Sequence, residues 1–359
     1  MSRILATTLL VGIFAYISCY PAFSQGFSGL GTAAEGFEVP KRGTQLSFPS
    51  DHGSHPRFRI EWWYITANLT GSDGKQYGVQ WTLFRSAIKP ETTGDGGSWS
   101  SSQLWMGHAA ITSRNTHLVS ETLSRGNLEL AGVTVSPFHA WINDWSFASR
   151  DQTAQTIDKM SLSATGENFS YELDLDALGP LVTHGDQGYS VKSQSGQASH
   201  YYSQPFYQVE GALHLPDGSV DVTGNAWLDR EWSSQPLASQ QTGWDWVSLS
   251  FADGSKLMGF RLRQEDQNYF SSGTWVSASG EPTPYSNGDL KLTPLKTVQV
   301  EGRAIPVRWR VELPDREIDV EVEALNNGAW MKTSIPYWEG PVIISGSRSG
   351  VGYLEMTGY

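Results

Sequence analysis

The chain has 359 residues, of which 39% are hydrophobic, 12% aromatic and only 17% charged, and its formal net charge is −12. An acidic chain without a basic run is a poor binder of nucleic acid, which argues against a nucleic-acid partner. The 15 tryptophans, 14 tyrosines and 14 phenylalanines, beside 37 glycines, favour strands joined by tight turns. No long amphipathic helical pattern occurs, so we expect an all-β protein, and its length predicts two domains.

The chain begins with the pattern of an export signal. Arg3 precedes an apolar run from Ile4 to Ile17, and Ala22-Phe-Ser24 places small residues where a signal peptidase needs them. We predict a signal peptide over residues 1–24 and a periplasmic or secreted mature protein. The apolar run is too short for a permanent membrane span, and no later segment reaches the required length.

The single cysteine, Cys19, lies within this predicted leader. Ile17-Ser-Cys19 is weakly similar to a lipid-attachment box, but Tyr16 stands where leucine is usual, so lipidation of Cys19 is the less favoured alternative. Cleavage after Ser24 leaves no cysteine, which excludes disulfides, a thiol nucleophile and thiolate metal ligands. Walker and dinucleotide motifs are missing, so we expect no cofactor. We also expect no metal, because Asp51-His-Gly-Ser-His55 lacks the spacing and third ligand of zinc motifs.

Turn signals divide the chain into hairpins, in which two strand-like runs flank a turn rich in Gly and Asp. Three such hairpins are 61–70 with 76–84, 207–215 with 220–227, and 246–251 with 256–262.

A polar stretch without periodicity, residues 193–199, separates the two halves of the chain. We therefore place the domain boundary near residue 198, with an N-terminal domain over residues 25–198 and a C-terminal domain over residues 199–359. Antiparallel sheets hide their edges by closing into barrels, and a barrel of about eight strands can enclose one apolar ligand. Each half is therefore expected to form an antiparallel β-barrel.

The stretch from Gly224 to Trp232 combines tryptophans with carboxylates. If it is extended, its side chains alternate between two faces, with Trp227, Asp229 and Glu231 on one and Leu228, Arg230 and Trp232 on the other.

Two carboxylates on one face with an indole favour acid chemistry. Aromatic walls and a neighbouring like charge raise the pKa of a carboxyl, so Asp229 or Glu231 would hold a proton at neutral pH and act as a general acid. In the alternative, both carboxylates form ion pairs with Arg230 or nearby cations at a barrel rim, while the tryptophans fill a core. Both interpretations remain open at this point.

A second aromatic group, Gly243-Trp-Asp-Trp246, follows about a dozen residues later. The π faces of these indoles suit an apolar ligand or a developing cation. The candidate ligand-binding residues of the two stretches are Trp227, Arg230, Trp232, Trp244, Asp245 and Trp246.

Three further candidates lie in the N-terminal half. Alternation places Glu61 on the same face as Trp63, so that an acid points into a largely apolar barrel. A buried carboxylate needs a partner, and Arg85 or Arg59 would provide it, so anchoring of the sheet is the alternative to ligand binding. His108 stands on an apolar strand, either as an acid or base of the pocket or as a hydrogen-bonded core histidine.

Several separated motifs occur in one order along the mature chain. They are Arg59-Ile-Glu-Trp-Trp-Tyr64, Gln80-Trp-Thr-Leu-Phe-Arg85, Trp105-Met-Gly-His108, Gly224 to Trp232, Tyr337-Trp-Glu-Gly340 and the final ten residues from Gly350. Together they resemble the AttH family, whose members are often labelled predicted secreted hydrolases. The resemblance implies two lipocalin-like β-barrels with a ligand cavity at or between them, in an exported protein associated with an ABC exporter of the AttEFG type.

More distantly, the chain is similar to the carotenoid 1,2-hydratases, and that resemblance implies the addition of water to a polyene. The chain departs from their His-x-Trp motif, because Arg230 replaces the histidine two residues before Trp232. Their acid lies on the next strand, near Leu257 to Phe260 here, where no carboxylate stands. The hydrolase label also lacks support, since Gly346-Ser-Arg-Ser-Gly350 has arginine where a nucleophile elbow has serine.

Two functions follow from the sequence. In the first, an exported protein binds an apolar or polyene-like molecule and delivers it to or from an ABC transport system. In the second, an enzyme uses Asp229 or Glu231 as a general acid for hydration, isomerisation or cyclisation of such a molecule. The replaced histidine and the missing acid favour binding.

Overall fold

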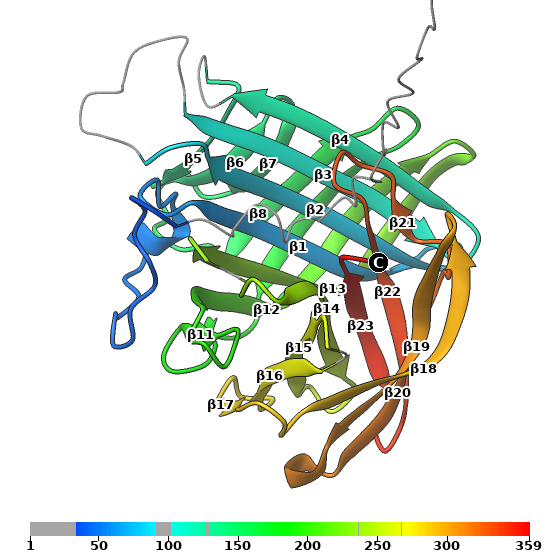
Figure 1. Cartoon of the computed structure of the whole chain (residues 1–359). Coiled ribbons are helices and arrows are strands. Elements are labelled where there is room, and N and C mark those ends of the chain that lie inside the picture. Colours follow the sequence, from blue (N-terminus) through cyan, green and yellow to red (C-terminus); the bar gives the residue numbers. More distant parts are fainter. Residues whose placement is uncertain (1–33, 91–101, 126–128, 236, 267) are drawn as a thin grey trace, which may run out of the picture.

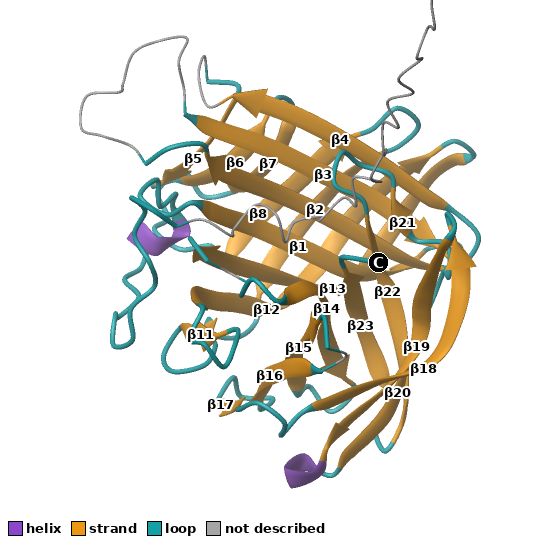
Figure 2. Ribbon diagram, in the orientation of Figure 1, coloured by secondary structure: helices purple, strands orange, loops and turns teal. Residues whose placement is uncertain are grey.

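The computed structural model describes residues 34–90, 102–125, 129–235, 237–266 and 268–359 (Figure 1). The predicted signal peptide and Cys19 lie outside these residues. The described part is built almost entirely from strands and contains only two short 3-10 turns, η2 (Ser50–His52) and η3 (Pro314–Arg316), as Figure 2 shows. The expected all-β class is confirmed. None of the described helices is long and apolar enough to cross a membrane.

The first sheet has 13 strands in the order β4-β3-β2-β1-β13-β12-β9-β8-β7-β6-β5, with β10 and β11 paired to β12, and it curls into a nearly closed barrel. Its strands are β1 (Ile60–Gly71), β2 (Gln76–Ala87), β3 (Gln103–Ser113), β4 (His117–Arg125), β5 (Ala131–Val135), β6 (Phe138–Ile142), β7 (Trp145–Ser149), β8 (Lys159–Thr165), β9 (Ser170–Ala177), β10 (Val182–Thr183), β11 (Tyr189–Val191), β12 (Ala198–Leu215) and β13 (Gly218–Ser233).

The second sheet has 10 strands in the order β17-β16-β15-β14-β23-β22-β20-β19-β18, with β21 paired to β22, and it forms a half-barrel. Its strands are β14 (Gln241–Phe251), β15 (Lys256–Gln264), β16 (Tyr269–Val276), β17 (Pro282–Tyr285), β18 (Lys291–Val300), β19 (Arg303–Leu313), β20 (Ile318–Ala324), β21 (Trp330–Met331), β22 (Tyr337–Gly346) and β23 (Gly350–Met356). Two packed lipocalin-like barrels are therefore confirmed.

The three predicted hairpins all form, as β1 with β2, β12 with β13, and β14 with β15. The chain passes from the first sheet to the second between Ser233 and Gln241, so the change of sheet does not coincide with the expected boundary near residue 198. The reason is that β13 pairs along its length with β1, so the β12–β13 hairpin completes the first sheet. A polar stretch marks a loop, but it does not show which sheet the following strand joins.

Hydrophobic side chains form one core inside each barrel and a third between them. The first contains Trp63, Trp81 and Leu228, and the second contains Leu249 and Trp309. The third core joins side chains of both sheets, namely Tyr64, Tyr201, Trp227, Leu237, Trp246, Met258, Phe260, Leu262, Phe270 and Tyr353. Most of β1 and the second half of β13, from Ala226 to Ser233, are thus buried on both faces.

Candidate functional site

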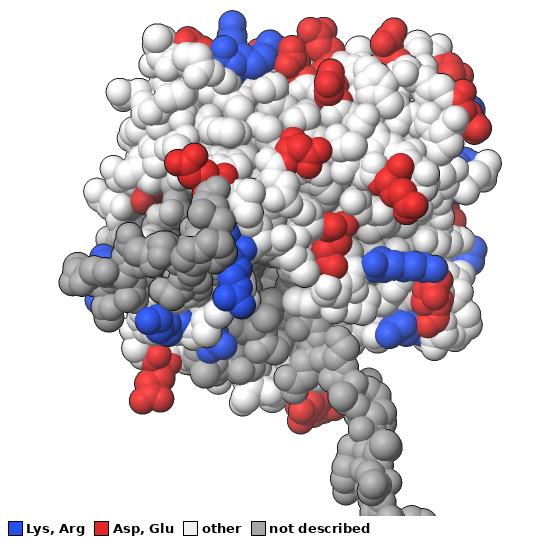
Figure 3. Space-filling model, turned by 90° about the horizontal axis from the view of Figure 1, so that it is seen from above, with Lys and Arg blue, Asp and Glu red and all other residues white. Residues whose placement is uncertain are grey.

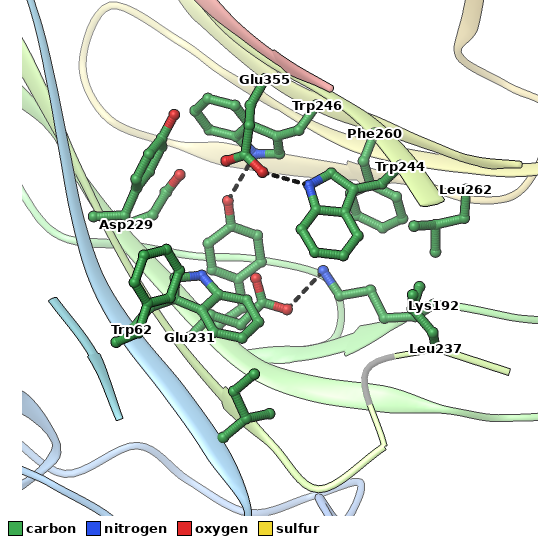
Figure 4. A pocket seen from close by; sticks show the side chains of 14 residues that line it. Trp62, Lys192, Asp229, Glu231, Leu237, Trp244, Trp246, Phe260, Leu262 and Glu355 are labelled. Carbon is green, nitrogen blue, oxygen red and sulfur yellow. Dashed lines mark hydrogen bonds and ion pairs between the residues drawn. The ribbon is translucent and has the colours of Figure 1, made fainter. Parts of the chain in front are cut away.

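A cavity lies between the two barrels, with a volume of about 70 Å³ (Figure 4). Seven of the residues that line it are aromatic, namely Trp62, Tyr64, Phe84, Tyr201, Trp244, Trp246 and Phe260, and four have acidic or basic side chains, namely Lys192, Asp229, Glu231 and Glu355. The strands β1, β12 and β13 of the first sheet face β14, β15 and β23 of the second across this space.

Strand alternation places the two predicted carboxyls of β13 at this cavity. Asp229 and Glu231 line it, and Trp227 packs into the core between the barrels. Leu228 points the other way, into the core of the first barrel, where the guanidinium of Arg230 lies over the ring of Trp63. The predicted division of this stretch into two faces is confirmed.

Asp229 is buried, with 2% of its surface exposed. It accepts hydrogen bonds from Ser203 Oγ and, at 2.7 Å, from Trp227 Nε1, and no cation forms an ion pair with it in the described part of the chain. Burial raises the pKa of Asp229 to about 7, although hydrogen bonds from Ser203, Trp227 and Tyr201 oppose the rise. Asp229 therefore exchanges a proton near neutral pH, and it does not form the rim ion pair of the alternative interpretation.

Glu231 follows the ion-pair interpretation and pairs with a nearby cation other than Arg230. Its Oε1 lies 2.9 Å from Nζ of Lys192, which follows β11. The same ammonium lies 4.2 Å from the ring centroid of Phe260 and 4.8 Å from that of Tyr201. Lys192 thus balances the charge of Glu231. No local pattern indicates this pairing, because the two residues are 39 positions apart.

A third carboxyl, Glu355, enters the cavity from β23 (Figure 4). Trp244 Nε1 donates a hydrogen bond of 2.7 Å to its Oε1. Burial raises the pKa of Glu355 to about 7, the hydrogen bonds from Trp244 and Tyr64 oppose the rise, and the charges of Asp229 and Glu231 add to it. The cavity therefore holds two carboxyls that bind a proton near neutral pH.

Glu355 lies in the final segment that carries the family resemblance, but no pattern in the sequence indicates a role for it. The available signal was an isolated acid on an apolar strand, Gly350–Met356. Its position became clear only from the pairing of β23 with β14, where Glu355 stands opposite Trp246. The expected gap at residues 257–260 is real, but an acid reaches the cavity from the other neighbour of β14.

The model of the AttH-like family matches residues 39–359. The chain belongs to this family. A crystal structure described as an AttH from Nitrosomonas europaea is 30% identical to this AttH-like protein, with a TM-score of 0.79, and the match covers 90% of this chain and 100% of that one. Kievitone hydratase from Nectria haematococca is 15% identical, with a TM-score of 0.67 over 90% of this chain and 98% of the other, a likeness of fold alone. No curated protein sequence matches.

Other predicted site residues of this AttH-like protein lie away from the cavity, at one end of the first barrel. Glu61 is fully buried and pairs with Arg85 and, at 2.5 Å, with Arg230. Burial alone would raise the pKa of Glu61, but the two guanidinium groups hold it well below its usual range. Trp63 donates its indole N–H to the carbonyl of His52, and Trp232 stacks on His55 with ring centroids 3.9 Å apart. This arrangement anchors the loop before β1, as the structural interpretation of Glu61 expects.

Two further candidates, Asp245 and His108, also lie away from the cavity between the barrels. Asp245 is buried on the opposite face of β14, where it pairs with Arg263 and, at 2.9 Å, with Arg261. His108 is buried between the sheets, with Nδ1 at 3.0 Å from the hydroxyl of Tyr337 and Nε2 at 3.0 Å from Glu121. His108 is thus a hydrogen-bonded histidine at the contact of the two barrels.

Acidic side chains are spread over the face of the molecule shown in Figure 3, and the basic ones on this face occur in small separate groups. Among the described residues, no three His, Cys, Asp or Glu side chains are grouped so that they could hold a metal ion. The cavity between the barrels is the place where aromatic side chains surround carboxyls with a raised pKa.

Proposed function

We propose that this AttH-like protein binds a neutral, apolar small molecule in the cavity between its two barrels. The observation that carries this proposal is the aromatic lining contributed by both sheets, with few polar groups. Small-molecule sites are mostly apolar, are rich in aromatic side chains and often lie between domains. Flat π faces suit a conjugated or isoprenoid chain, because they offer large contact areas at little cost in side-chain entropy.

The size and charge of the cavity restrict the ligand further. A volume of about 70 Å³ admits a few water molecules, so a larger ligand requires the half-buried Trp62 and Trp244 to move. The ammonium of Lys192 is already paired with Glu231. An anionic ligand would be placed beside Asp229 and Glu355 and would bind only if these carboxyls took up protons. A neutral molecule with a hydroxyl or keto group avoids this repulsion.

A second function, acid catalysis on the bound molecule, is favoured by the two carboxyls whose pKa lies at about 7. A general acid works best when its pKa lies near the working pH. Transfer of the proton to one carbon of a double bond leaves a cation on the other, and the faces of Trp62, Trp244 and Trp246 would stabilise it. Water or a second double bond then attacks the cation, and the released proton returns to a carboxylate. The solved structure named as a hydratase has the same fold.

The cellular setting is part of the proposal. The apolar leader, residues 4–17, and the resemblance to the AttH family support export of the protein and a partnership with an ABC transport system of the AttEFG type. In that setting the protein delivers its ligand to or from the transporter.

Binding is tested by titration of all-trans-retinol, with quenching of tryptophan fluorescence as the signal. We expect saturable quenching at one retinol per chain. We also expect weaker binding of retinoic acid, with a larger deficit at pH 8.5 than at pH 6, because the carboxyls of the cavity are ionised at the higher pH. Leu262→Trp, which fills the cavity, should abolish quenching, whereas Asp245→Asn, on the opposite face of β14, should not. Failure of every polyene and isoprenoid alcohol in a panel to quench would refute the proposal.

Catalysis is tested by incubating the protein with the same panel in D₂O and measuring deuterium incorporated into carbon by mass spectrometry. We expect Asp229→Asn or Glu355→Gln to lower the rate by about 100-fold. Retinol binding should remain, because both replacements keep the shape of the side chain. Binding without any deuterium incorporation would show that the protein carries the molecule and does not catalyse this reaction on it.

A further inference from the structure

A chain of hydrogen-bonded groups leads away from the cavity between the two sheets. It begins at Glu355, which is hydrogen-bonded to Tyr64 of β1. The hydroxyl of Tyr64 donates to Oε1 of Glu339, which is 1% exposed on β22. Glu339 is in turn hydrogen-bonded to Tyr337 of the same strand.

The chain continues to the surface through the first sheet. The hydroxyl of Tyr337 lies 3.0 Å from Nδ1 of His108, and Nε2 of His108 lies 3.0 Å from Oε1 of Glu121. Glu121 is partly exposed, and it accepts hydrogen bonds from the backbone N–H and the hydroxyl of Ser334. These groups thus lead from the cavity to solvent on the far side of the contact between the barrels.

We propose that Glu121, His108, Tyr337, Glu339 and Tyr64 form a proton relay that supplies Glu355 from solvent. The relay rests on the proposed acid chemistry, since only a carboxyl that gives up its proton needs another. It is most useful when a bound ligand fills the cavity and excludes water. No oxidation or reduction is involved, because one proton enters at Glu121 and one arrives at Glu355.

Each inner member of the relay can both donate and accept a hydrogen bond, as proton transfer along a chain requires. Burial raises the pKa of Glu339 well above its usual range, and the charge of Glu355, which stands opposite it in register, adds to the rise. Burial thus favours the neutral form of Glu339, which carries one O–H. Burial lowers the pKa of His108, so its ring is neutral and carries one donor and one acceptor.

Tyr171 and Tyr353 lie near Glu339 but outside the relay, and burial together with the nearby Glu339 carboxyl raises the pKa of each. Tyr171 donates its hydroxyl at 2.9 Å to the carbonyl of Gln80. Tyr353 is buried between the sheets, like Tyr337, and its interactions do not include a hydrogen bond to Glu339. Tyr353→Phe is therefore a matched control for Tyr337→Phe, since each removes one buried hydroxyl.

The relay is tested without any ligand, by the exchange of the Glu339 carboxyl from COOH to COOD after dilution into D₂O. Infrared spectroscopy follows the shift of its C=O band, which is assigned by its loss in Glu339→Gln. We expect Tyr337→Phe to slow this exchange by at least about tenfold, because the proton must then enter by the cavity or by local opening. Tyr353→Phe should leave the rate unchanged.

The direction of entry decides the outcome. If Tyr337→Phe exchanges as fast as the wild-type protein while Tyr64→Phe is slow, the proton enters from the cavity and the relay is overturned. If both variants exchange at the wild-type rate, water reaches Glu339 by another path and the relay is again overturned. Near-ultraviolet circular dichroism confirms that the variants are folded. Because the assay uses no ligand, failure of the binding proposal leaves its result unchanged.

Discussion

Replacement of Asp229 by asparagine should stabilise the protein at alkaline pH. Asparagine keeps the shape of the side chain and an oxygen that accepts from Ser203 and Trp227, but it cannot ionise. In the wild-type protein, burial raises the pKa of this carboxyl from 3.8 to about 7. At about 1.36 kcal/mol for each pH unit of that rise, ionised Asp229 costs the folded state roughly 4 kcal/mol above pH 7.

The sign and the pH window follow from proton linkage. Between about pH 4 and pH 7, folded Asp229 holds a proton that the unfolded chain has lost, so wild-type stability from this group falls as pH rises. The advantage of Asp229→Asn should therefore grow across this window and then stay constant above pH 7. Urea unfolding of both proteins at pH 4.5, 6, 7.5 and 9 measures it.

Asp245→Asn is the matched control, because it removes a carboxylate that is equally buried but paired with two arginines. It should destabilise the protein by about 3–5 kcal/mol, since it leaves buried cations without their partner. A stability difference between Asp229→Asn and the wild-type protein that is independent of pH, or a loss of stability in Asp229→Asn like that of Asp245→Asn, would contradict this prediction.

Two other substitutions test the fold. Glu61→Gln should lower the free energy of unfolding by about 3–5 kcal/mol in urea titrations, because Arg85 and Arg230 lose the carboxylate between them. An unchanged urea midpoint would show that these ion pairs do not anchor this end of the barrel. Gly78→Ala should lower it by about 1–3 kcal/mol, because the new Cβ would lie 2.5 Å from Pro341 across the contact of the sheets. A wild-type melting temperature for Gly78→Ala would show that this contact is loose.

Local patterns predicted much of the fold. Alternation along Gly224 to Trp232 correctly assigned which side chains share a face, and the turn residues of the hairpins located β1 with β2 and β14 with β15. Strand alternation and turn composition depend only on residues that are close in sequence, so they can be recognised without the structure.

Long-range pairing limited the prediction of the site. Glu355 reaches the cavity because β23 pairs with β14, more than 100 positions earlier in the chain, and Lys192 reaches Glu231 from a loop. Arg230 and Asp245, both predicted to bind the ligand, instead form buried ion pairs on the faces of β13 and β14 that point away from the cavity. Proximity along a strand is thus a poor guide to a shared site.

The central claim is that the cavity between the barrels holds a small apolar molecule. Native mass spectrometry of the protein purified from its own source, followed by extraction and identification of what co-purifies, tests this most directly. We predict one neutral apolar molecule per chain, absent from Leu262→Trp purified in parallel. A mass equal to the bare polypeptide, or the same molecule retained by Leu262→Trp, would contradict the account.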